Sequence, residues 1–287
     1  MSEDPPAPAK GARPLPGVSQ VSQASQQGPA PIEAEALESP LLATGGFAHA
    51  FFTRRGGVSA PPWDTLNAAA STGDDPAAVR ENLARAARRL GVPAARLYFL
   101  SQVHGVAARV LEGGEDRDAI TREMGDITLS RTSGVGCGVR SADCAPVLVA
   151  DRRSGAVVAI HSGWRGTVRR AAIEGVAALR RIAGEGAELI AAIGPHIEAC
   201  CFEVDEDVAA ELAACSTAGV AATRRAGGAR PRVDLRRILR AQLGEAGLTA
   251  AAIDDVRGCS VCDAARFFSY RRDGQRSGRL LSAIVAR

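Results

Sequence analysis

The chain has 287 residues, of which 46% are hydrophobic and 23% are charged, and its formal net charge is +3. These values suit a globular protein with a sizeable core, and dispersed arginines with few aromatic residues give no support for nucleic-acid binding. The sequence has no secretory signal and no apolar run long enough to span a membrane. Its odd number of cysteines, seven, indicates free thiols in a reducing compartment, so we expect a cytoplasmic protein. We also expect a monomer.

The N-terminal segment, residues 1–40, is rich in Pro, Ala, Ser and Gln. It has too few large apolar side chains to offset the entropy lost on ordering the chain. We therefore predict a disordered tail over 1–40 and one folded domain over 41–287. A transit peptide is less favoured because the tail carries acidic residues, among them Glu3 and Glu33.

Helix signals recur along the folded part of the chain. The first predicted helix has Asp75 as N-cap and ends at Gly91. Thr167 is the predicted N-cap of a second helix that presents an apolar face, and Asp205 opens a third. A fourth helix lies in "VDLRRILRAQLGEAG" and ends at Gly247.

Short apolar runs predict the strands, which in chain order are "VGCGVR", "APVLVA", "AVVAIH", "ELIAAIG" and the terminal "LLSAIVAR". The second and third runs are separated only by a short turn at 153–155, which predicts an antiparallel hairpin. Strands and helices do not alternate strictly, as they would in a doubly wound fold. We predict the α+β class, a single layered α/β domain with mixed β-sheets covered by helices.

The predicted hairpin places a thiol beside an imidazole. Cys144 precedes its first strand and His161 ends its second, so both lie at the same edge of the sheet. His104 occupies another glycine-containing turn, in "SQVHG". Two imidazoles and one thiolate match a donor set of catalytic zinc sites, which keep the fourth coordination position open. The spacing matches no standard metal motif, so these residues raise the hypothesis of a metal site without deciding it.

A second interpretation makes Cys144 a nucleophile. His161 would then act as base, with Asp143 or His104 orienting it, as in thiol hydrolases. Both interpretations need a thiolate beside an imidazole, and the sequence alone leaves them open.

Two Arg–Gly turns indicate an anionic substrate. Arg54 lies in "FFTRRGGVS" and Arg165 in "HSGWRGT". Glycine lets backbone N–H groups approach an anion, and the arginine fork suits phosphate or carboxylate.

The "CSVC" motif, Cys259 to Cys262, has the spacing of half a zinc knuckle. Its only possible mate is the adjacent pair Cys200 and Cys201, and neighbouring residues cannot easily both ligate one tetrahedral ion. We therefore favour buried thiols without a metal at these positions.

Seven motifs together carry a family resemblance: "FFTRRGGVS", "LN" at Leu66–Asn67, "SQVHG", "SADCAPVLV", "HSGWRGT", "IGPHIEACCFEV" and "FFSYRRDG". Their order resembles that of the laccase-domain (polyphenol oxidase-like, YfiH) family over residues 44–287. The resemblance implies a layered α/β fold with a mixed sheet. It also implies that His104, Cys144 and His161 are the zinc ligands and the catalytic residues.

The same resemblance implies the activity of a zinc-dependent purine nucleoside phosphorylase. Such enzymes cleave adenosine, inosine and S-methyl-5′-thioadenosine with phosphate to the base and (methylthio)ribose 1-phosphate, and some also deaminate adenosine. We expect Arg54 and Arg165 to bind phosphate, and Asn67 and Gln102 to orient the ribose. Nucleoside and phosphate are then the small-molecule partners, with no nucleic acid and no membrane.

Zinc is the expected cofactor, although copper could occupy the site in vitro because affinity generally rises from zinc to copper. The older multicopper oxidase label is disfavoured, since such a centre needs far more histidines than the four present. Two alternatives remain. One is a thiol amidase that edits peptidoglycan precursors through Cys144, as some bacterial relatives are thought to do, and the other is a non-catalytic metal-binding protein.

Overall fold

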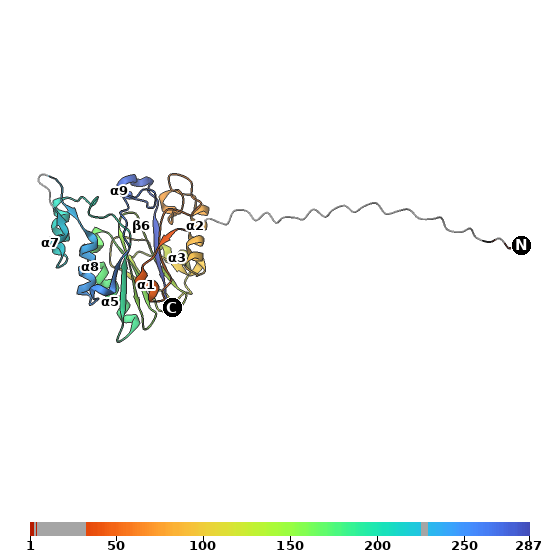
Figure 1. Ribbon diagram of the computed structural model, residues 1–287, viewed down its shortest axis with the longest axis horizontal. Helices are drawn as coiled ribbons and strands as arrows, with labels where there is room; N and C mark the ends of the chain where they lie inside the picture. Colours follow the sequence, from red (N-terminus) through yellow and green to blue (C-terminus); the bar gives the residue numbers. More distant parts are fainter. Residues whose placement is uncertain (3, 5–32, 225–228) are drawn as a thin grey trace. The chain divides into compact units, whose positions relative to one another are not determined.

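The computed structural model describes residues 1–2, 4, 33–224 and 229–287 (Figure 1). Most of the predicted tail over 1–40 therefore lies outside the described residues. Its last part belongs to the fold, because strand β1 (Ala36–Leu37) pairs with β2 (His49–Phe52) and the side chain of Ser39 is buried. The folded domain thus begins earlier than the predicted boundary at residue 41.

The described strands form two mixed sheets and a two-stranded ribbon. Antiparallel pairs predominate, with β3–β6, β4–β5 and β9–β12 parallel. This arrangement confirms the predicted α+β class. In spatial order the strands of the first sheet are β1, β2, β13 (Leu280–Val285), β6 (Gly136–Ser141) and β3 (Leu97–Tyr98). Those of the second sheet are β12 (Ile253–Asp255), β9 (Leu189–Ile193), β7 (Ala145–Asp151), β8 (Val157–Ser162), β5 (Ile127–Ser130) and β4 (Ala108–Val110). The ribbon consists of β10 (Thr223–Arg224) and β11 (Arg232–Val233).

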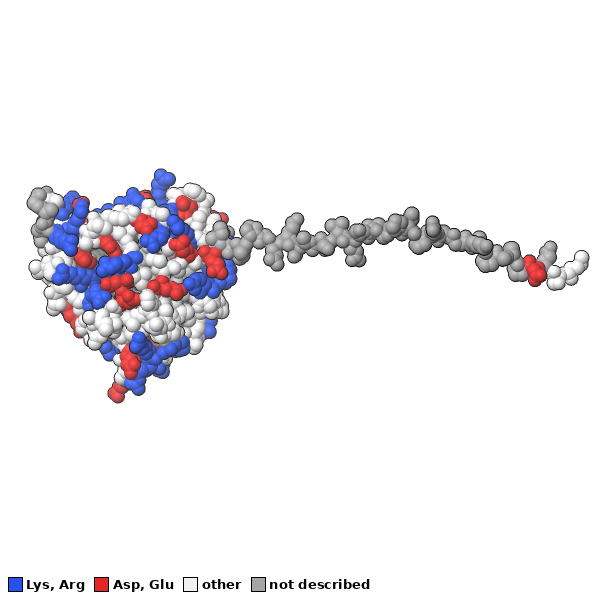
Figure 2. Space-filling view, in the orientation of Figure 1, with Lys and Arg blue, Asp and Glu red and all other residues white. Residues whose placement is uncertain are grey.

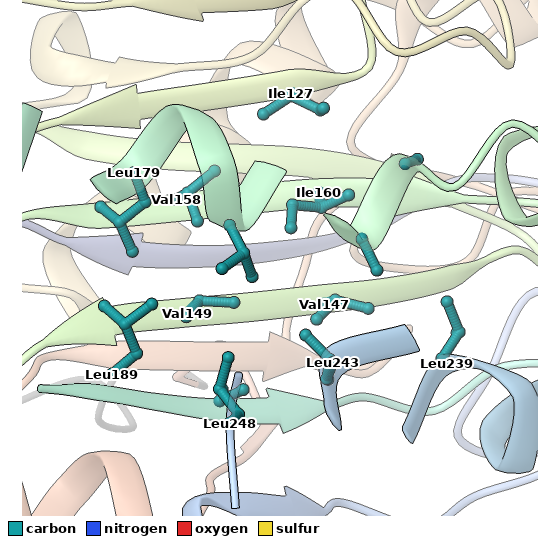
Figure 3. Close-up of a cluster of buried hydrophobic side chains, with 14 of the residues drawn as sticks. Ile127, Val147, Val149, Val158, Ile160, Leu179, Leu189, Leu239, Leu243 and Leu248 are labelled. Carbon is teal, nitrogen blue, oxygen red and sulfur yellow. The ribbon is translucent and has the colours of Figure 1, made fainter. Parts of the chain in front are cut away.

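The two sheets pack face to face, with helices on their outer sides (Figure 1). Side chains alternate along a strand, so Leu148 of β7 faces the other sheet while Val147 and Val149 face helices α5 (Ala171–Ala183) and α8 (Leu235–Glu245) (Figure 3). Helix α2 (Pro76–Arg89) covers the outer face of the first sheet. The central strands are buried on both faces, which explains why "APVLVA" is a continuous apolar run.

Three of the four predicted helices are confirmed. Helix α2 begins after Asp75, whose carboxylate accepts a hydrogen bond from the Ala77 backbone. Helix α6 (Glu206–Ala214) follows Asp205, and α8 ends just before Gly247, which has φ +92°. Shorter helices complete the described set: α1 (Pro40–Thr44), α3 (Arg117–Arg122), α4 (Trp164–Val168), α7 (Gly219–Ala222) and α9 (Tyr270–Asp273).

The predicted N-cap at Thr167 is wrong. Thr167 lies inside α4, and its buried hydroxyl group contacts that of Ser162 at 2.9 Å. The chain then breaks at Arg170, where φ is 63°, before α5 begins. Two helices therefore replace the single predicted one, because the hydroxyl of Thr167 bonds to the end of β8 instead of a helix terminus.

Basic and acidic side chains intermingle on the face shown in Figure 2, as the near-neutral charge predicts. Among the described residues, no helix combines the length and the apolar character needed to cross a membrane.

Candidate active site

The β7–β8 hairpin brings Cys144 and His161 together, as predicted. Pro146 pairs with His161, and Cys144 lies directly before β7. His104 joins them from the loop between β3 and β4. The ligand atoms of the three side chains all lie within 4.8 Å of one another, with 3.8 Å between Cys144 Sγ and His104 Nε2.

A buried carboxylate, that of Asp126 before β5, organises this cluster. Its Oδ1 accepts hydrogen bonds from Nδ1 of His161 at 2.8 Å and from the His104 backbone at 3.0 Å, and its Oδ2 accepts one from the Gly105 backbone at 2.7 Å. The bond to Nδ1 leaves Nε2 of His161 as the nitrogen that can bind a metal, the usual carboxylate–histidine–metal arrangement. Sequence analysis missed Asp126, because nothing in "MGDITLS" distinguishes it from a loop aspartate.

Ionisation of Cys144 and His161 is coupled. Burial opposes ionisation of the Cys144 thiol, but the charge of His161 and hydrogen bonds from both histidines outweigh it and lower the pKa to about 6. Burial disfavours protonation of His161, but the Cys144 thiolate and Asp126 raise its pKa to about 9. The site therefore favours a thiolate, the form that binds a metal.

The donor set fits a zinc ion. Tetrahedral zinc with one Zn–S bond of about 2.3 Å and one Zn–N bond of about 2.0 Å separates sulfur from nitrogen by about 3.5 Å, close to the 3.8 Å between Cys144 and His104. A Cβ atom at Gly163 would lie 2.6 Å from Cys144 Sγ and 3.0 Å from His104 Cδ2, so the ligands occupy space that only glycine leaves free. His104 and Asp143 have positive φ values, 59° and 95°, and such strained backbone clusters at functional sites.

We expect Asp126→Asn to weaken zinc binding by about 10- to 100-fold, because the amide cannot match the carboxylate as acceptor for His161 and the backbone amides of 103–105. Competition with a chromogenic chelator measures this affinity. Asp75→Asn is the matched control, since asparagine caps a helix about as well as aspartate. Unchanged affinity in Asp126→Asn would contradict the assigned role.

The cluster opens into a cavity of about 520 Å³, within the range of small-molecule sites. Its apolar lining includes Trp164, Phe202 and Tyr270, whose flat rings can stack on a heterocyclic base. Loops and the ends of β6, α8 and α9 supply the rest of the lining: Ala69, Ser71, Ser101, Gln102, Arg140, Ser141, Ala142, Asp143, Gly163, Ile197, Leu235, Arg271 and Arg279.

Three arginines give the cavity an excess of positive charge. Arg140, Arg271 and Arg279 line it, and none forms an ion pair with a carboxylate among the described residues. Burial, together with the positive charges of Arg279 and Arg117, lowers the pKa of Arg140 to about 10. A bound anion would relieve this repulsion.

Gln102 lines the cavity, but both ends of its amide bind the main chain of Arg140, at 2.6 and 2.7 Å. Asn67 is fully buried and does not line the cavity. Its side chain holds the loop that carries Ala69, and it accepts a hydrogen bond from the Arg279 backbone at 2.8 Å. Both residues thus support cavity-lining arginines through the backbone.

The two arginines singled out by sequence lie elsewhere. The guanidinium group of Arg54 donates to the backbone and carboxylate of Asp64 and to the Ala264 carbonyl. Arg165 is exposed and stacks on Trp164, 4.4 Å from the ring centre. Neither lines the cavity. The lining arginines come instead from "GVRSADC" and from "SYRRDGQRSGR", the second of which overlaps a motif already noted in the sequence.

Comparisons with known proteins agree with this architecture. Residues 48–287 match the family described as multi-copper polyphenol oxidoreductase laccase. A purine nucleoside phosphorylase of Streptomyces coelicolor is 38% identical over 240 residues, covering 83% of this chain and 95% of the relative. The adenosine deaminase RL5, from an unknown prokaryote, is 34% identical and covers 88% of this chain and 98% of that protein.

The crystal structure of YlmD from Geobacillus stearothermophilus superimposes with a TM-score of 0.79 at 30% identity, covering 90% of this chain and all of that one. The match of the family model and the relatives extends over nearly the whole folded part, including the loops that carry the cluster. The chain therefore belongs to the multi-copper polyphenol oxidoreductase laccase family.

Proposed function

We propose that this cavity catalyses the phosphorolysis of purine nucleosides, namely adenosine, inosine and S-methyl-5′-thioadenosine, with zinc held by His104, Cys144 and His161. The observation that carries the proposal is the presence, in one cavity of about 520 Å³, of the metal donor set and of three arginines that form no ion pair among the described residues. The names of the relatives, purine nucleoside phosphorylase among them, support it.

In this mechanism Arg140 and Arg279 bind the phosphate, and the aromatic side chains hold the purine. A phosphate oxygen then forms a bond to C1′ of the ribose while the bond from C1′ to the purine nitrogen breaks, and the base leaves with the electron pair. Zinc, when bound, supplies a Lewis acid that stabilises the charge developed in this step. Asp126 fixes the ring of His161 throughout.

Phosphate dependence tests the proposal. Adenosine and inosine are incubated with and without inorganic phosphate, and products are separated by chromatography. We expect free base and ribose 1-phosphate only when phosphate is present. Absence of ribose 1-phosphate from both substrates would end the proposal. Inosine formed from adenosine without phosphate would identify deamination as an additional activity, as the name of the relative RL5 suggests.

Arg279→Met should raise the KM for phosphate by about 10- to 100-fold, because a hydrogen bond to a charged group contributes about 1.5–3 kcal/mol. The KM for the nucleoside should change much less. Arg165→Met is the matched control, since Arg165 lies outside the cavity lining. The reverse result, a larger effect at Arg165, would move the phosphate site to the turn predicted from sequence.

A thiol amidase acting through Cys144 is the second candidate. The observation that favours it is the thiolate–imidazolium pair of Cys144 and His161, with Asp126 behind the imidazole, which is the arrangement of a thiol hydrolase. Chelation separates the candidates: an amidase keeps its activity on peptidoglycan precursor amides without zinc, whereas the phosphorylase loses its own.

A further inference from the structure

A second cluster of sulfur atoms lies outside the active-site cavity. The Sγ atoms of Cys200, Cys201, Cys259 and Cys262 all lie within 4.8 Å of one another. Cys262 Sγ is 3.3 Å from that of Cys201 and 3.6 Å from that of Cys200. Tetrahedral zinc with four Zn–S bonds of about 2.3 Å separates its sulfurs by about 3.8 Å, so the cluster has the dimensions of a mononuclear tetrathiolate site.

The objection that adjacent cysteines cannot share one ion does not hold for this backbone. The Glu198 carbonyl accepts hydrogen bonds from both Cys201 and Phe202 at 2.9 Å, so the chain turns tightly at this point. Neighbouring side chains point to opposite sides in an extended strand, but they diverge much less in a helical turn. Cys200 and Cys201 can therefore approach the same point. The expectation of buried thiols is wrong here, because Cys200 and Cys262 are exposed.

The two cysteine pairs are held in register by the backbone. His196 donates to the Gly258 carbonyl at 3.1 Å, and Ser260 donates to the His196 carbonyl at 3.0 Å. A second turn, closed by Asp263 and the Cys259 carbonyl at 3.1 Å, forms the C-x-x-C loop. Preformed loops of this kind lower the entropy lost on binding a metal.

The surroundings complement the charge that a tetrathiolate site would carry. Four thiolates and one Zn²⁺ have a net charge of about −2. Arg224, Arg230 and Arg232 line a surface hollow together with Cys200, and of these Arg230 and Arg232 also form ion pairs with Asp205 and Glu203. Among common metals, zinc matches this donor set best, because a closed shell of four thiolates is typical of structural zinc sites.

We propose that Cys200, Cys201, Cys259 and Cys262 bind a structural zinc ion. The ion joins the loop that follows β9 to the loop that follows β12, two segments about sixty residues apart in sequence. Ile197 and Phe202, on the first loop, line the active-site cavity.

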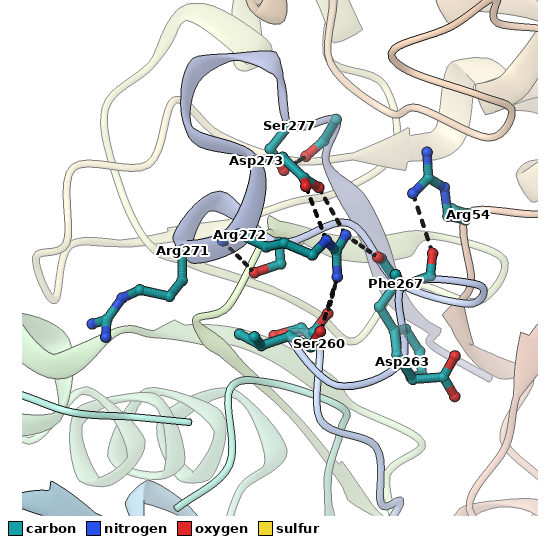
Figure 4. A network of polar contacts seen from close by, with 12 residues as sticks. Arg54, Ser260, Asp263, Phe267, Arg271, Arg272, Asp273 and Ser277 are labelled. Atoms are coloured by element: carbon teal, nitrogen blue, oxygen red, sulfur yellow. Dashed lines mark hydrogen bonds and ion pairs between the residues drawn. The ribbon is translucent and has the colours of Figure 1, made fainter. Parts of the chain in front are cut away.

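The second loop reaches the catalytic cluster through polar contacts. Ser260 donates to the carboxylate of Asp143, the neighbour of Cys144, at 2.6 Å. The guanidinium group of Arg272 donates to the carbonyls of Ser260 and Phe267 and bonds to Asp273, which ties the loop to α9 (Figure 4). The structural zinc therefore fixes one wall of the cavity and takes no part in the chemistry.

Metal analysis of the full chain, purified under reducing conditions, tests this site separately from activity. We expect about two zinc ions per chain in the wild type and about one in His104→Ala/Cys144→Ser, which leaves the four-cysteine cluster intact. Cobalt added to this double variant after a chelator has removed its zinc should give the intense visible absorption and the sulfur-to-cobalt charge transfer of a tetrathiolate ion. Cys200→Ser/Cys262→Ser should also contain about one zinc ion.

Cys215→Ser is the matched control, because Cys215 lies outside both clusters, and it should keep the wild-type zinc content.

Thiol counting provides the second measurement on His104→Ala/Cys144→Ser. The four thiols should be protected until a chelator is added. Two results would overturn the proposal: His104→Ala/Cys144→Ser protein that contains no zinc, or thiols that react at the same rate with and without chelator. Neither result depends on the catalytic activity of the wild-type enzyme.

Discussion

Cys144→Ser is expected to abolish phosphorolysis and to remove about one zinc ion per chain, leaving the fold intact. Serine keeps the shape of the side chain, but its hydroxyl stays neutral where the thiol, with its pKa near 6, is a thiolate. Loss of an outer partner of a metal ligand already costs about 10- to 100-fold. Loss of the ligand itself should therefore reduce kcat/KM by more than about 100-fold.

Zinc content, kcat/KM for inosine and the thermal unfolding midpoint measure this result together. Cys215→Ser provides the comparison, since the same exchange there leaves the cluster untouched. A Cys144→Ser protein that retains its zinc but loses activity would favour the nucleophilic role of Cys144 over the metal-ligand role. Retained activity would exclude both roles.

Gly163→Ala should also reduce kcat/KM strongly, as Cys144→Ser does, although glycine has no functional group in its side chain. Its Cβ would lie 2.6 Å from Cys144 Sγ and 3.0 Å from His104 Cδ2, so two of the proposed zinc ligands must move by several tenths of an ångström or more. A displacement of about 1 Å at a catalytic centre can cost 100-fold in rate. We expect a loss of about that size in kcat/KM, together with weaker zinc binding.

Gly244→Ala is the matched control. Gly244 lies in α8, and a Cβ there meets no atom within 4 Å. The exchange should leave activity unchanged and stabilise the helix by about 0.5–1 kcal/mol. Equal zinc affinity in wild-type and Gly163→Ala protein would show that the site relaxes around the added methyl group. It would contradict the inference that only glycine at position 163 leaves room for Cys144 and His104.

Local signals predicted much of the candidate site. Strand ends and the hairpin turn sufficed to place Cys144 beside His161, because antiparallel pairing relates residues close in sequence. The arginines were harder to predict. Arg54 and Arg165 lie in glycine-containing turns in the sequence, but the fold directs them to Asp64 and to the ring of Trp164.

The cavity arginines illustrate why such contacts escape sequence reasoning. Arg140 lies near the end of β6, whereas Arg271 and Arg279 lie more than 100 residues later, and only the packing of both sheet edges brings all three to one cavity. Asp126 and the four-cysteine cluster are similar cases. Each depends on pairing between segments far apart along the chain, a property that no local pattern encodes.

The sequence by itself determined much of the local structure: where α2 and α6 begin, where α2 and α8 end, five of the strands (β6, β7, β8, β9 and β13), and that the class is α+β. These features follow from capping, periodicity and turn chemistry over a few residues. Only the tertiary structure decided which side chains share the cavity, that Asp126 orients His161, and that Cys200 and Cys201 approach Cys259 and Cys262. Those contacts arise from the face-to-face packing of two sheets and the register of their loops, which long-range pairing sets.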